Sequence, residues 1–265
     1  MNGFQVSVNP VTIENHQFEF SICTMVTRQK EYGEMLSSFK EKGFDDTNSE
    51  FIYVDNSKEN SLDAYTSTNL FLRQARGKYI IICHQDILLH SDGISELRSI
   101  VEDLIHIDPK WAICGNAGAV APNHIVYHIT YPDGTFMKKG NFPIKVQSLD
   151  ENFLVVRNSA NLRVSSDMVG FHLYATDLVL QAELNGFTSY VIPFNLIHKS
   201  RGNKNAEFFK LKKQLSRKYN HYFRSRWIQT NSTVFHLSGN LTGRLLGNKF
   251  FLFFVRMING LKKRM

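Results

Sequence analysis

Three groups of polar residues lie within or just after apolar, strand-like runs. Thr24 lies in the first run, Asp55 and Asn56 follow the second, and His84 and Asp86 follow the third. In open α/β sheets, ligands bind beyond the carboxyl ends of the strands. We therefore expect these side chains to meet at one edge of a sheet, where Asp55 would accept hydrogen bonds from a base or a ribose. A divalent cation held by Asp86 would bridge to a pyrophosphate at the same edge.

The segments that would position these groups alternate between strand-like and helix-like patterns. Strands are predicted at 18–26, 50–54, 78–83, 111–114, 153–156 and 190–197, helices at 30–42, 61–75, 91–107, 177–184 and 205–223, and a hairpin at 125–131 and 135–139. Ser91 or Asp92 would cap the third helix, and Asp177 has the type and place of a cap for the fourth. The alternation predicts an α/β fold with a mostly parallel central sheet flanked by helices.

The phosphate-binding signatures of two common nucleotide folds do not occur in the sequence. No Gly-x-Gly-x-x-Gly follows the first strand and no Gly-x-x-x-x-Gly-Lys-Ser/Thr is present, which disfavours a dinucleotide-binding fold and a P-loop. A nucleotidyltransferase on a similar sheet is an alternative. Such enzymes usually have a Gly-rich basic loop after the first strand, whereas the stretch 24–28 contains no glycine. A bound nucleotide must therefore be held by other groups.

Cysteine usage and hydropathy bear on the compartment. Cys23, Cys83 and Cys114 each lie in an apolar run, and such a sparse, odd set predicts buried thiols in a reducing compartment. Residues 1–15 lack a basic stretch followed by an apolar one, so we expect no cleaved export signal. No run of about 18 apolar residues occurs, so we expect no spanning helix. These patterns predict a cytoplasmic protein.

Charge divides the chain into two parts of opposite sign. Residues 199–265 carry 16 Lys and Arg against one acid, a net charge of +15, whereas residues 1–198 carry 15 against 23 acids, a net charge of −8. We therefore expect a globular domain at 1–225 and a basic, apolar C-terminal extension at 226–265 that binds an anionic surface. Nucleic acid is not the expected partner, because the aromatic residues of 205–223 have the spacing of a packed helix.

The last part of this extension combines aromatic and basic residues. The run 250–255 is Phe-Phe-Leu-Phe-Phe-Val and lies between Lys249 and Arg256, with three more cations at 262–264. It is too short to span a bilayer, and an interfacial helix with basic flanks fits it better. Peripheral binding at the inner face of a membrane is one interpretation. The alternative is a helix that packs on the body of the protein or on a second subunit of a homo-oligomer.

Several motifs occur in an order that is typical of one enzyme family. They are the strand FSICTMV, the strand and turn FIYVDNS, Asn69-x5-Ala75-x-Gly77-Lys78-Tyr79-Ile80, the triplet His84-Gln85-Asp86, the segment Phe171-His172-Leu173-Tyr174-Ala175-Thr176-Asp177, and His198-Lys199-Ser200-Arg201-Gly202. In these motifs, from residue 18 to about 225, the chain resembles the inverting family-2 glycosyltransferases, which have the GT-A fold. The Asp-x-Asp triplet that is usual in the family is His-Gln-Asp here, as in a bacterial subgroup.

The resemblance implies roles for residues at the predicted edge of the sheet. It makes Asp86 a ligand of a divalent cation, Mn²⁺ or Mg²⁺, with His84 and His198 as further ligands. An imidazole in place of a carboxylate shifts the preference towards Mn²⁺ or another softer ion. A nucleotide-sugar donor would be held by Thr24, Asp55, Asn56, Asn69, Arg76, His84 and Asp86.

Inverting transfer also needs a general base that removes the proton of an acceptor hydroxyl. The resemblance points to the acid at the late helix, so Asp177 is the first candidate and Asp167 the second. His172 is a third candidate base or an acceptor contact. Many relatives carry a further acid where this chain has Ala175. That departure supports an alternative function as a non-catalytic relative that binds glycan or membrane.

The resemblance and the residues together predict a glycosyltransferase. We expect it to move a sugar from a nucleoside-diphosphate sugar, specifically a UDP-sugar, to a hydroxyl of a glycan or lipid-linked glycan. The resemblance implies a place in surface polysaccharide assembly, such as that of capsule or O-antigen.

Overall fold

The computed structural model describes residues 15–200 and 205–262, with the backbone alone for 259–262. Residues 1–14, Arg201 and Gly202 therefore lie outside the described residues, as do the cations at 263 and 264. The chain divides into a larger unit, Met1–Phe208, and a smaller unit, Phe209–Met265. The division lies inside the helix α5 (Ala206–Tyr222), and the boundary expected after residue 225 stays a prediction.

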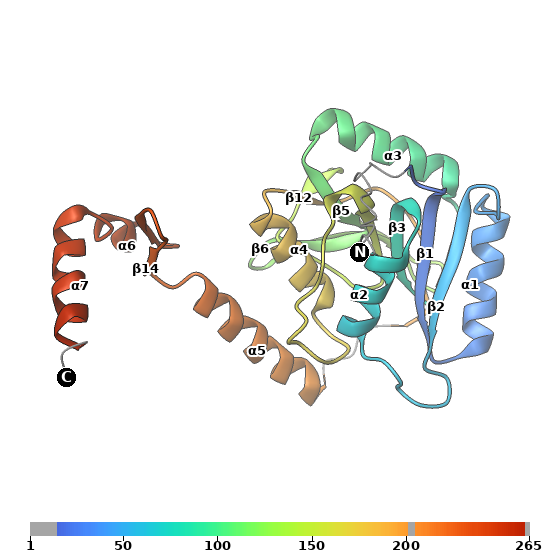
Figure 1. The fold of residues 1–265 in the computed structure, drawn as a ribbon. Coiled ribbons are helices and arrows are strands. Elements are labelled where there is room, and N and C mark those ends of the chain that lie inside the picture. Colours follow the sequence, from blue (N-terminus) through green and yellow to red (C-terminus); the bar gives the residue numbers. More distant parts are fainter. Residues whose placement is uncertain (1–14, 201–204, 263–265) are drawn as a thin grey trace, which may run out of the picture. The chain divides into compact units, whose positions relative to one another are not determined.

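The larger unit is built on a seven-stranded sheet (Figure 1). Its strands, in spatial order, are β2 (Ser49–Asp55), β1 (Phe18–Val26), β3 (Gly77–His84), β11 (Phe153–Arg157), β5 (Trp111–Gly115), β12 (Thr188–Val191) and β9 (Ile144–Lys145). The strands β3 and β11 are runs of buried apolar residues, as expected for strands that are covered on both faces. The predicted α/β fold with a central sheet flanked by helices is confirmed.

One central strand runs against the predicted parallel pattern. β1 is parallel to β2 and to β3, and β12 is parallel to β5, but β11 is antiparallel to both of its neighbours, β3 and β5. Five of the seven strands therefore run in one direction, so the sheet is mostly parallel, with β11 and the edge strand β9 running against the others. Phe153, at the start of β11, pairs with Cys83 near the end of β3. The chain that enters β11 thus arrives at the carboxyl edge of β3.

Helices cover both faces of this sheet. α1 (Gln29–Glu41) and α3 (Ile94–Ile107) share one hydrophobic cluster with alternate residues of β1 and β3, among them Phe20, Ile22 and Ile81. Because side chains alternate along a strand, the residues between these face the other side. There α2 (Ala64–Gln74) contacts β1 and β3, α4 (Tyr174–Leu184) contacts β5 and β12, and the two helices contact each other.

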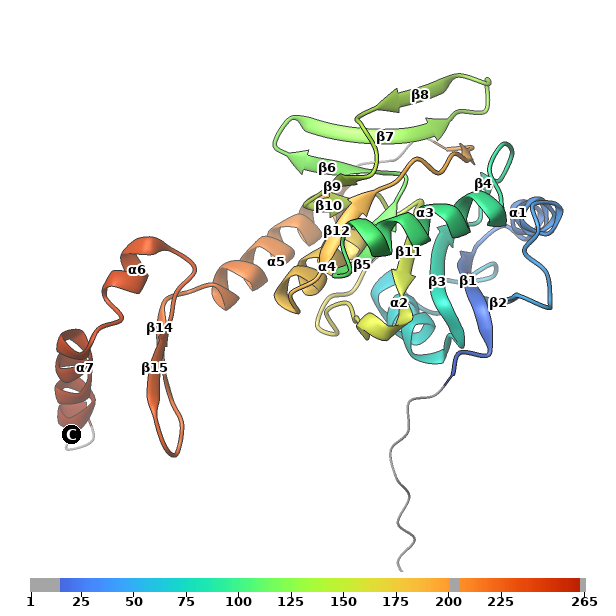
Figure 2. The ribbon, with the colours of Figure 1, turned by 90° about the horizontal axis from the view of Figure 1, so that it is seen from above.

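A second, smaller sheet adds the residues that complete the site. It contains β10 (Ser148–Leu149), β6 (Ala117–Ala121), β7 (His124–Thr130), β13 (Ile197–His198) and β4 (Ile87–Leu88), with β8 (Phe136–Lys139) paired to β7. Figure 2 shows β6, β7 and β8 as a ribbon distinct from the central sheet. The predicted hairpin is confirmed as β7–β8. The single strand predicted at 190–197 is wrong, because the chain passes Pro193 and divides between β12 and β13, which belong to different sheets.

The predicted cap of α3 is also wrong. The helix begins one turn later than its pattern indicated, after Gly93, whose N–H donates to the Glu96 carboxylate at 2.8 Å. Asp92 instead accepts the backbone N–H of Asn195 at 2.6 Å, and Ser91 accepts the side-chain amide of Asn195 at 3.1 Å. These two residues thus hold the segment between β12 and β13 against the start of α3.

The cysteines and the hydropathy of the helices bear on two of the sequence predictions. All three cysteines are buried and free, so the prediction of unpaired thiols in the core is confirmed. Within residues 15–200 and 205–262, no helix has both the length and the apolar character needed to cross a membrane.

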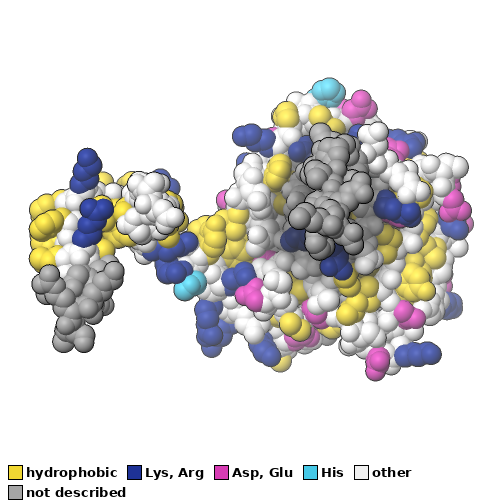
Figure 3. Space-filling model, in the orientation of Figure 1, with side chains coloured by type: hydrophobic (Ala, Val, Ile, Leu, Met, Phe, Trp, Pro, Cys, Tyr) yellow, Lys and Arg dark blue, Asp and Glu magenta, His cyan; other side chains and the backbone are white. Residues whose placement is uncertain are grey.

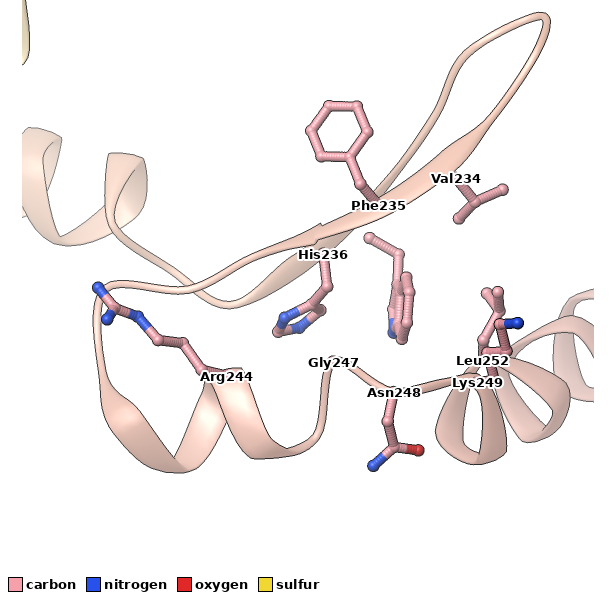
Figure 4. A pocket seen from close by; sticks show the side chains of 9 residues that line it. Val234, Phe235, His236, Arg244, Gly247, Asn248, Lys249 and Leu252 are labelled. Atoms are coloured by element: carbon pink, nitrogen blue, oxygen red, sulfur yellow. The ribbon is translucent and has the colours of Figure 1, made fainter.

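The smaller unit contains the rest of α5, a hairpin and two helices. β14 (Arg226–Gln229) pairs antiparallel with β15 (Val234–Leu237), and α6 (Leu241–Leu245) and α7 (Lys249–Lys262) follow. Neither the hairpin nor α6 was predicted from the sequence. A cavity of about 400 Å³ lies between the hairpin and the start of α7 (Figure 4), lined by Trp227, Val234, Phe235, His236, Arg244, Gly247, Asn248, Lys249 and Leu252.

Gly77 starts β3 at a point where β1 comes too close for a side chain. A Cβ there would lie 2.5 Å from the backbone nitrogen of Ser21 and 2.6 Å from the carbonyl carbon of Phe20. We predict that Gly77→Ala lowers the free energy of unfolding by about 2–4 kcal/mol, because two hydrogen-bonded strands must separate to admit the methyl group. Urea unfolding of both proteins measures the difference.

Gly33→Ala is the matched control for this change. Gly33 is exposed in α1, and a Cβ there has no other atom within 4 Å. We expect it to raise stability by about 0.5–1 kcal/mol through helix propensity. Equal effects of the two substitutions would show that the contact with β1 is unimportant.

Candidate functional site

Two histidines and an aspartate meet at the carboxyl end of β3. Nδ1 of His84 lies 3.9 Å from Oδ1 of Asp86, and Nε2 of His198 lies 3.5 Å from the same oxygen. One ligand atom from each residue lies within 4.8 Å of the other two. The centroids of the two imidazole rings are 5.7 Å apart. The structure thus brings together the three residues predicted to bind a metal.

Short strands bring these residues together from distant parts of the sequence. His84 ends β3, and the chain then passes Asp86 and enters β4. β13 pairs antiparallel with β4, which places His198 opposite Ile87. The backbone N–H of Lys199 donates to the carbonyl of Asp86 at 3.0 Å, which closes the ladder beside the carboxylate. The site therefore depends on the segment after β12, which runs back to β4 and pairs with it as β13.

Gln85, the middle residue of the triplet, binds the protein backbone instead. Its Oε1 accepts the N–H groups of Thr27 and Arg28, both at 2.8 Å, and its Nε2 donates to Oγ1 of Thr27 at 2.7 Å. These bonds satisfy the side chain of a residue that is 7% exposed. Gln85 thus fixes the loop between β1 and α1 next to the three ligands.

Asp86 is held in its charged form although it is buried. Burial alone raises the pKa of its carboxyl group, but hydrogen bonds from His198 and Ser200 and the charges of His198 and His84 outweigh burial and hold the pKa well below its usual range. Burial of the ring, followed by the nearby His198, lowers the pKa of His84. A neutral imidazole is the form that binds metal ions.

The donor atoms of this group fit a divalent metal ion. The ionised carboxylate of Asp86 supplies negative charge and oxygen, and His84 and His198 supply nitrogen. Two imidazoles with one carboxylate suit transition metals such as Mn²⁺ better than Mg²⁺, which prefers oxygen ligands. The predicted possibility of a metal site here is confirmed as a set of residues, without an identity for the metal.

An acid pair at the start of β11 belongs to the same edge and was not predicted. Asp150 and Glu151 lie one residue before β11, and Oε1 of Glu151 accepts the N–H of Leu173 at 2.7 Å. Leu173 has a φ of +65°, in the left-handed region. The next residue, Tyr174, begins α4, and its hydroxyl lies 3.5 Å from Nε2 of His84 and donates to the Glu151 carbonyl at 3.3 Å. The backbone carbonyl of Glu151 is therefore linked through the Tyr174 hydroxyl to His84, one residue of the candidate metal group.

Glu151 has both a structural and an electrostatic role in this arrangement. A left-handed backbone costs a residue such as Leu173 about 1 kcal/mol, and the bond from the Glu151 carboxylate helps to stabilise it. Burial and the charge of Asp150 raise the pKa of Glu151 to about 7, although the Leu173 N–H lowers it in part. A carboxyl group with such a pKa can exchange a proton near neutral pH.

Asp55 lies at the predicted edge. It ends β2 opposite Val26, while His84 ends β3 opposite Met25, so both residues lie at the carboxyl ends of strands that flank β1. Two strand spacings separate them, about 10 Å. Asp55 is exposed, and hydrogen bonds from Ser57 lower the pKa of its carboxyl group.

The side chains of Thr24 and Asn56 are buried and bonded within the protein, and their role in donor binding stays a prediction. Thr24 is 1% exposed, with Oγ1 at 3.5 Å from the sulfur of Cys83, and so belongs to the core. Asn56 is 4% exposed, and its side chain bonds in both directions to the backbone of Leu62, at 2.8 and 3.2 Å. Its role is to close the loop that leads to α2.

Asn69 and Arg76 are likewise occupied by structural contacts. The Asn69 amide exchanges two hydrogen bonds of 3.0 Å with the backbone of Val164. Arg76 forms an ion pair with Glu50 at 2.6 Å and precedes Gly77 at the amino end of β3. The rise of the strand places Arg76 about 26 Å from His84, at the other end of β3, and a role for Arg76 in donor binding stays a prediction.

The three predicted base candidates lie in different surroundings. α4 begins at Tyr174, so Asp177 lies within its first turn, and the prediction that it caps the helix is wrong. Asp177 is fully buried, and its carboxylate accepts the N–H and the hydroxyl of Ser165 at 2.6 and 2.8 Å. Asp167 is exposed in the loop before α4. The His172 ring is half-buried and packs on Phe208 with centroids 5.7 Å apart.

Comparison with known proteins finds a relative by sequence. Over 213 residues the chain is 37% identical to a protein of Fuscovulum blasticum named ATP synthase subunits region ORF 6, and the match covers 78% of this chain and 86% of that protein. The chain belongs to the ORF 6 family. The name of the relative records a region and a reading frame and states no activity. No family profile matches the sequence.

Solved structures resemble this ORF 6 family protein only weakly. The mannosyltransferase PcManGT from Pyrobaculum calidifontis, solved with GDP-Man and Mn²⁺, is 12% identical with a TM-score of 0.48, over 77% of this chain and 62% of that one. Residues 1–349 of TarS from S. aureus are 12% identical with a TM-score of 0.46, over 78% of this chain and 75% of that one. The chain thus spans less than two thirds of PcManGT. Both scores lie below 0.5, and no conclusion about activity rests on them.

The raised pKa of Glu151 makes the stability of the ORF 6 family protein depend on pH. The unfolded chain loses this proton near pH 4.5 and the folded chain near pH 7, so stability falls as the pH rises between these values. We predict that Glu151→Gln removes this loss, because the amide stays neutral and its oxygen can still accept the Leu173 N–H. The variant should match the wild type near pH 4.5 and exceed it by roughly 3 kcal/mol at pH 8.

Urea unfolding from pH 4.5 to 8 with EDTA present measures this difference. Glu102→Gln is the control, because Glu102 is exposed on α3 and should leave the pH dependence unchanged. A stability difference between Glu151→Gln and the wild type that is constant across this pH range would contradict the assignment.

Proposed function

We propose that this protein transfers a glycosyl group from a nucleoside-diphosphate sugar to a hydroxyl group, with inversion at the anomeric carbon. The observation that supports this proposal is the convergence of His84, Asp86 and His198 at the carboxyl end of β3. The resemblance to family-2 glycosyltransferases assigns these three residues to the cation and the diphosphate. The acceptor that we propose is a glycan or a lipid-linked glycan in surface polysaccharide assembly.

The proposed reaction exchanges one bond for another at the anomeric carbon. The acceptor oxygen forms a bond to this carbon while the bond from the carbon to the diphosphate oxygen breaks. The electron pair of the broken bond leaves with the diphosphate, and the hydroxyl proton passes to a general base. The protein must therefore hold the diphosphate, place the acceptor on the opposite face of the sugar and take up one proton.

The residues around Asp86 would hold a divalent cation, for which we propose Mn²⁺ before Mg²⁺. Asp86 supplies an ionised carboxylate, and His84 and His198 supply nitrogen donors. When bound, the cation would neutralise the negative charge that develops on the departing diphosphate. Gln85 would keep the β1–α1 loop beside this charge by its bonds to Thr27 and Arg28.

Asp55 is the residue that we propose for recognition of the nucleoside. It is exposed at the end of β2, on the edge that also carries His84. Its carboxylate can accept hydrogen bonds from a ribose or from the N–H of a base such as uracil. Its low pKa keeps it ionised at neutral pH.

Glu151 is the general base that the surroundings favour. Its pKa of about 7 matches the requirement for taking a proton near neutral pH, and its backbone carbonyl accepts the Tyr174 hydroxyl, which lies 3.5 Å from Nε2 of His84. Asp177 fits the role less well than predicted, because it is fully buried and Ser165 donates two hydrogen bonds to its carboxylate. Asp167 is exposed and stays a candidate that the same experiment tests.

The donor site is tested by thermal unfolding with UDP, GDP, dTDP or CMP, each with Mn²⁺, Mg²⁺ or EDTA. We predict stabilisation by one nucleoside diphosphate that depends on the metal. A ligand at about 100 times its Kd stabilises by about 2.7 kcal/mol, which shifts the melting temperature by several degrees. Asp86→Asn should remove the shift, whereas Asp103→Asn, exposed on α3, should keep it.

Each other outcome of this screen has a definite meaning. A shift that persists in EDTA would keep the nucleotide and remove the metal from His84, Asp86 and His198. The absence of a shift with every nucleotide would contradict the donor site and favour a binding protein without transferase activity.

The base assignment predicts the behaviour of the catalytic rate. Glu151→Gln should lower kcat for transfer by at least about 100-fold with little change in the donor KM, because the proton then has no acceptor. In the wild type, kcat/KM should rise with pH and level off above about pH 7. Loss of activity in Asp167→Asn together with normal activity in Glu151→Gln would move the role to Asp167.

A further inference from the structure

The smaller unit is strongly positive. Residues 209–265 contain thirteen Lys and Arg and no Asp or Glu. Figure 3 shows dark blue basic side chains among yellow hydrophobic ones over this unit. A surface with this composition attracts a polyanion, whereas two copies of it repel each other.

α7 carries an exposed apolar stripe. Phe250, Phe253, Phe254, Met257 and Ile258 are spaced i, i+3, i+4, i+7 and i+8, so they lie on one face of the helix. Their exposed fractions are 66, 64, 40, 49 and 50% in that order. The rings of Phe250 and Phe254 contact each other with centroids 5.0 Å apart. These side chains form one continuous apolar surface.

A different side of α7 faces the hairpin across the cavity. Leu252 lines the cavity with Trp227 and His236, whose rings meet at 4.9 Å, and Figure 4 shows Leu252 directed towards the hairpin. At 100° per residue, Leu252 lies roughly opposite the middle of the stripe. The stripe therefore lies on the side of α7 away from this cavity.

Two cations flank the stripe along one side of the helix. Lys249 and Arg256 are two turns apart and both exposed, and around the helix they lie between Phe253 and Leu252, about 40–60° from each, with Lys249 also at the rim of the hairpin cavity. Their long aliphatic stems allow the charged groups to reach a polar layer while the rings lie deeper. Leu241 and Leu245 of α6, exposed 73 and 68%, add to the apolar surface of the unit.

We infer that the smaller unit docks on the surface of an anionic phospholipid bilayer. α7 lies in the plane of the interface, with its stripe at the boundary of headgroups and acyl chains and with Lys249 and Arg256 at lipid phosphates. Its 14 residues span about 21 Å, less than the roughly 30 Å hydrocarbon core, so it does not cross the bilayer. A nucleic acid would satisfy the cations but leave the aliphatic and aromatic stripe without an apolar partner.

Vesicle flotation of the full-length protein tests this inference. The probes are vesicles of phosphatidylcholine alone and vesicles with about 30% phosphatidylglycerol, at NaCl concentrations from 50 to 500 mM as set conditions. We expect at least about tenfold tighter binding to the anionic vesicles, weakened by salt. Phe250→Ser/Phe253→Ser should reduce binding at least about tenfold with the charge unchanged, and Lys249→Glu/Arg256→Glu should do the same with the stripe unchanged.

Each variant has a matched control on the larger unit. Phe136→Ser removes an exposed aromatic ring from β8, and Lys40→Glu/Lys110→Glu makes the same change in net charge. Both controls should bind anionic vesicles like the wild type. Circular dichroism and melting temperature establish that all variants fold, which is expected because the changed side chains are exposed.

Three results would overturn the inference. The first is no binding to anionic vesicles at 50 mM NaCl. The second is binding that Phe250→Ser/Phe253→Ser leaves unchanged, which would reduce it to adsorption by charge. The third is a dimer in light scattering that this variant makes monomeric, which would assign the stripe to a second copy of the chain. None of these results depends on the proposed transferase activity.

Discussion

A carboxylate that is removed from water must be surrounded by donors and positive charge, and this requirement at Asp86 organises the centre of the larger unit. Asp86 is 5% exposed, and its partners are His198 and Ser200, with His84 close by. These partners reach it because β13 pairs with β4 after the chain has left the central sheet at β12. The second sheet is thus connected to the first through a buried charge as well as through apolar packing.

The sequence was sufficient to locate most strands and helices of the larger unit and the residues of the metal group. Buried strands such as β3 are apolar runs of ordinary length, and helices such as α1 show their buried face by spacing, so pattern alone predicts both. Strand direction is different, because an apolar run such as 153–156 reads the same for a parallel and an antiparallel strand. The sequence therefore could not show at which edge of the sheet the acid pair 150–151 lies, and Glu151 was not predicted as a site residue.

Other differences between the expected and the observed positions of residues were indicated by the sequence itself. Ile22, Thr24 and Val26 lie on the same face of β1, because every second side chain of a strand points the same way. Ile22 and Val26 are buried, so this spacing already placed Thr24 in the core. Arg76 precedes its strand, which put it at the amino end. The division of 190–197 was signalled by Pro193. The faces of α7 could not be told apart from the sequence, because the run 250–255 is apolar on every side. In the structure Leu252 lines the cavity beside the hairpin, and this identifies the face that is turned inwards.

The position of Gln85 between His84 and Asp86, two residues of the candidate metal group, has a consequence for observing the site in solution. Its single carbonyl oxygen accepts the amide protons of both Thr27 and Arg28, while the residues before and after it carry the ligand atoms. The amides of Thr27 and Arg28 are therefore protected from hydrogen exchange while residues 84–86 hold their positions. Hydrogen exchange at residues 27 and 28 acts as a built-in reporter of whether the triplet is in place, readable without any substrate.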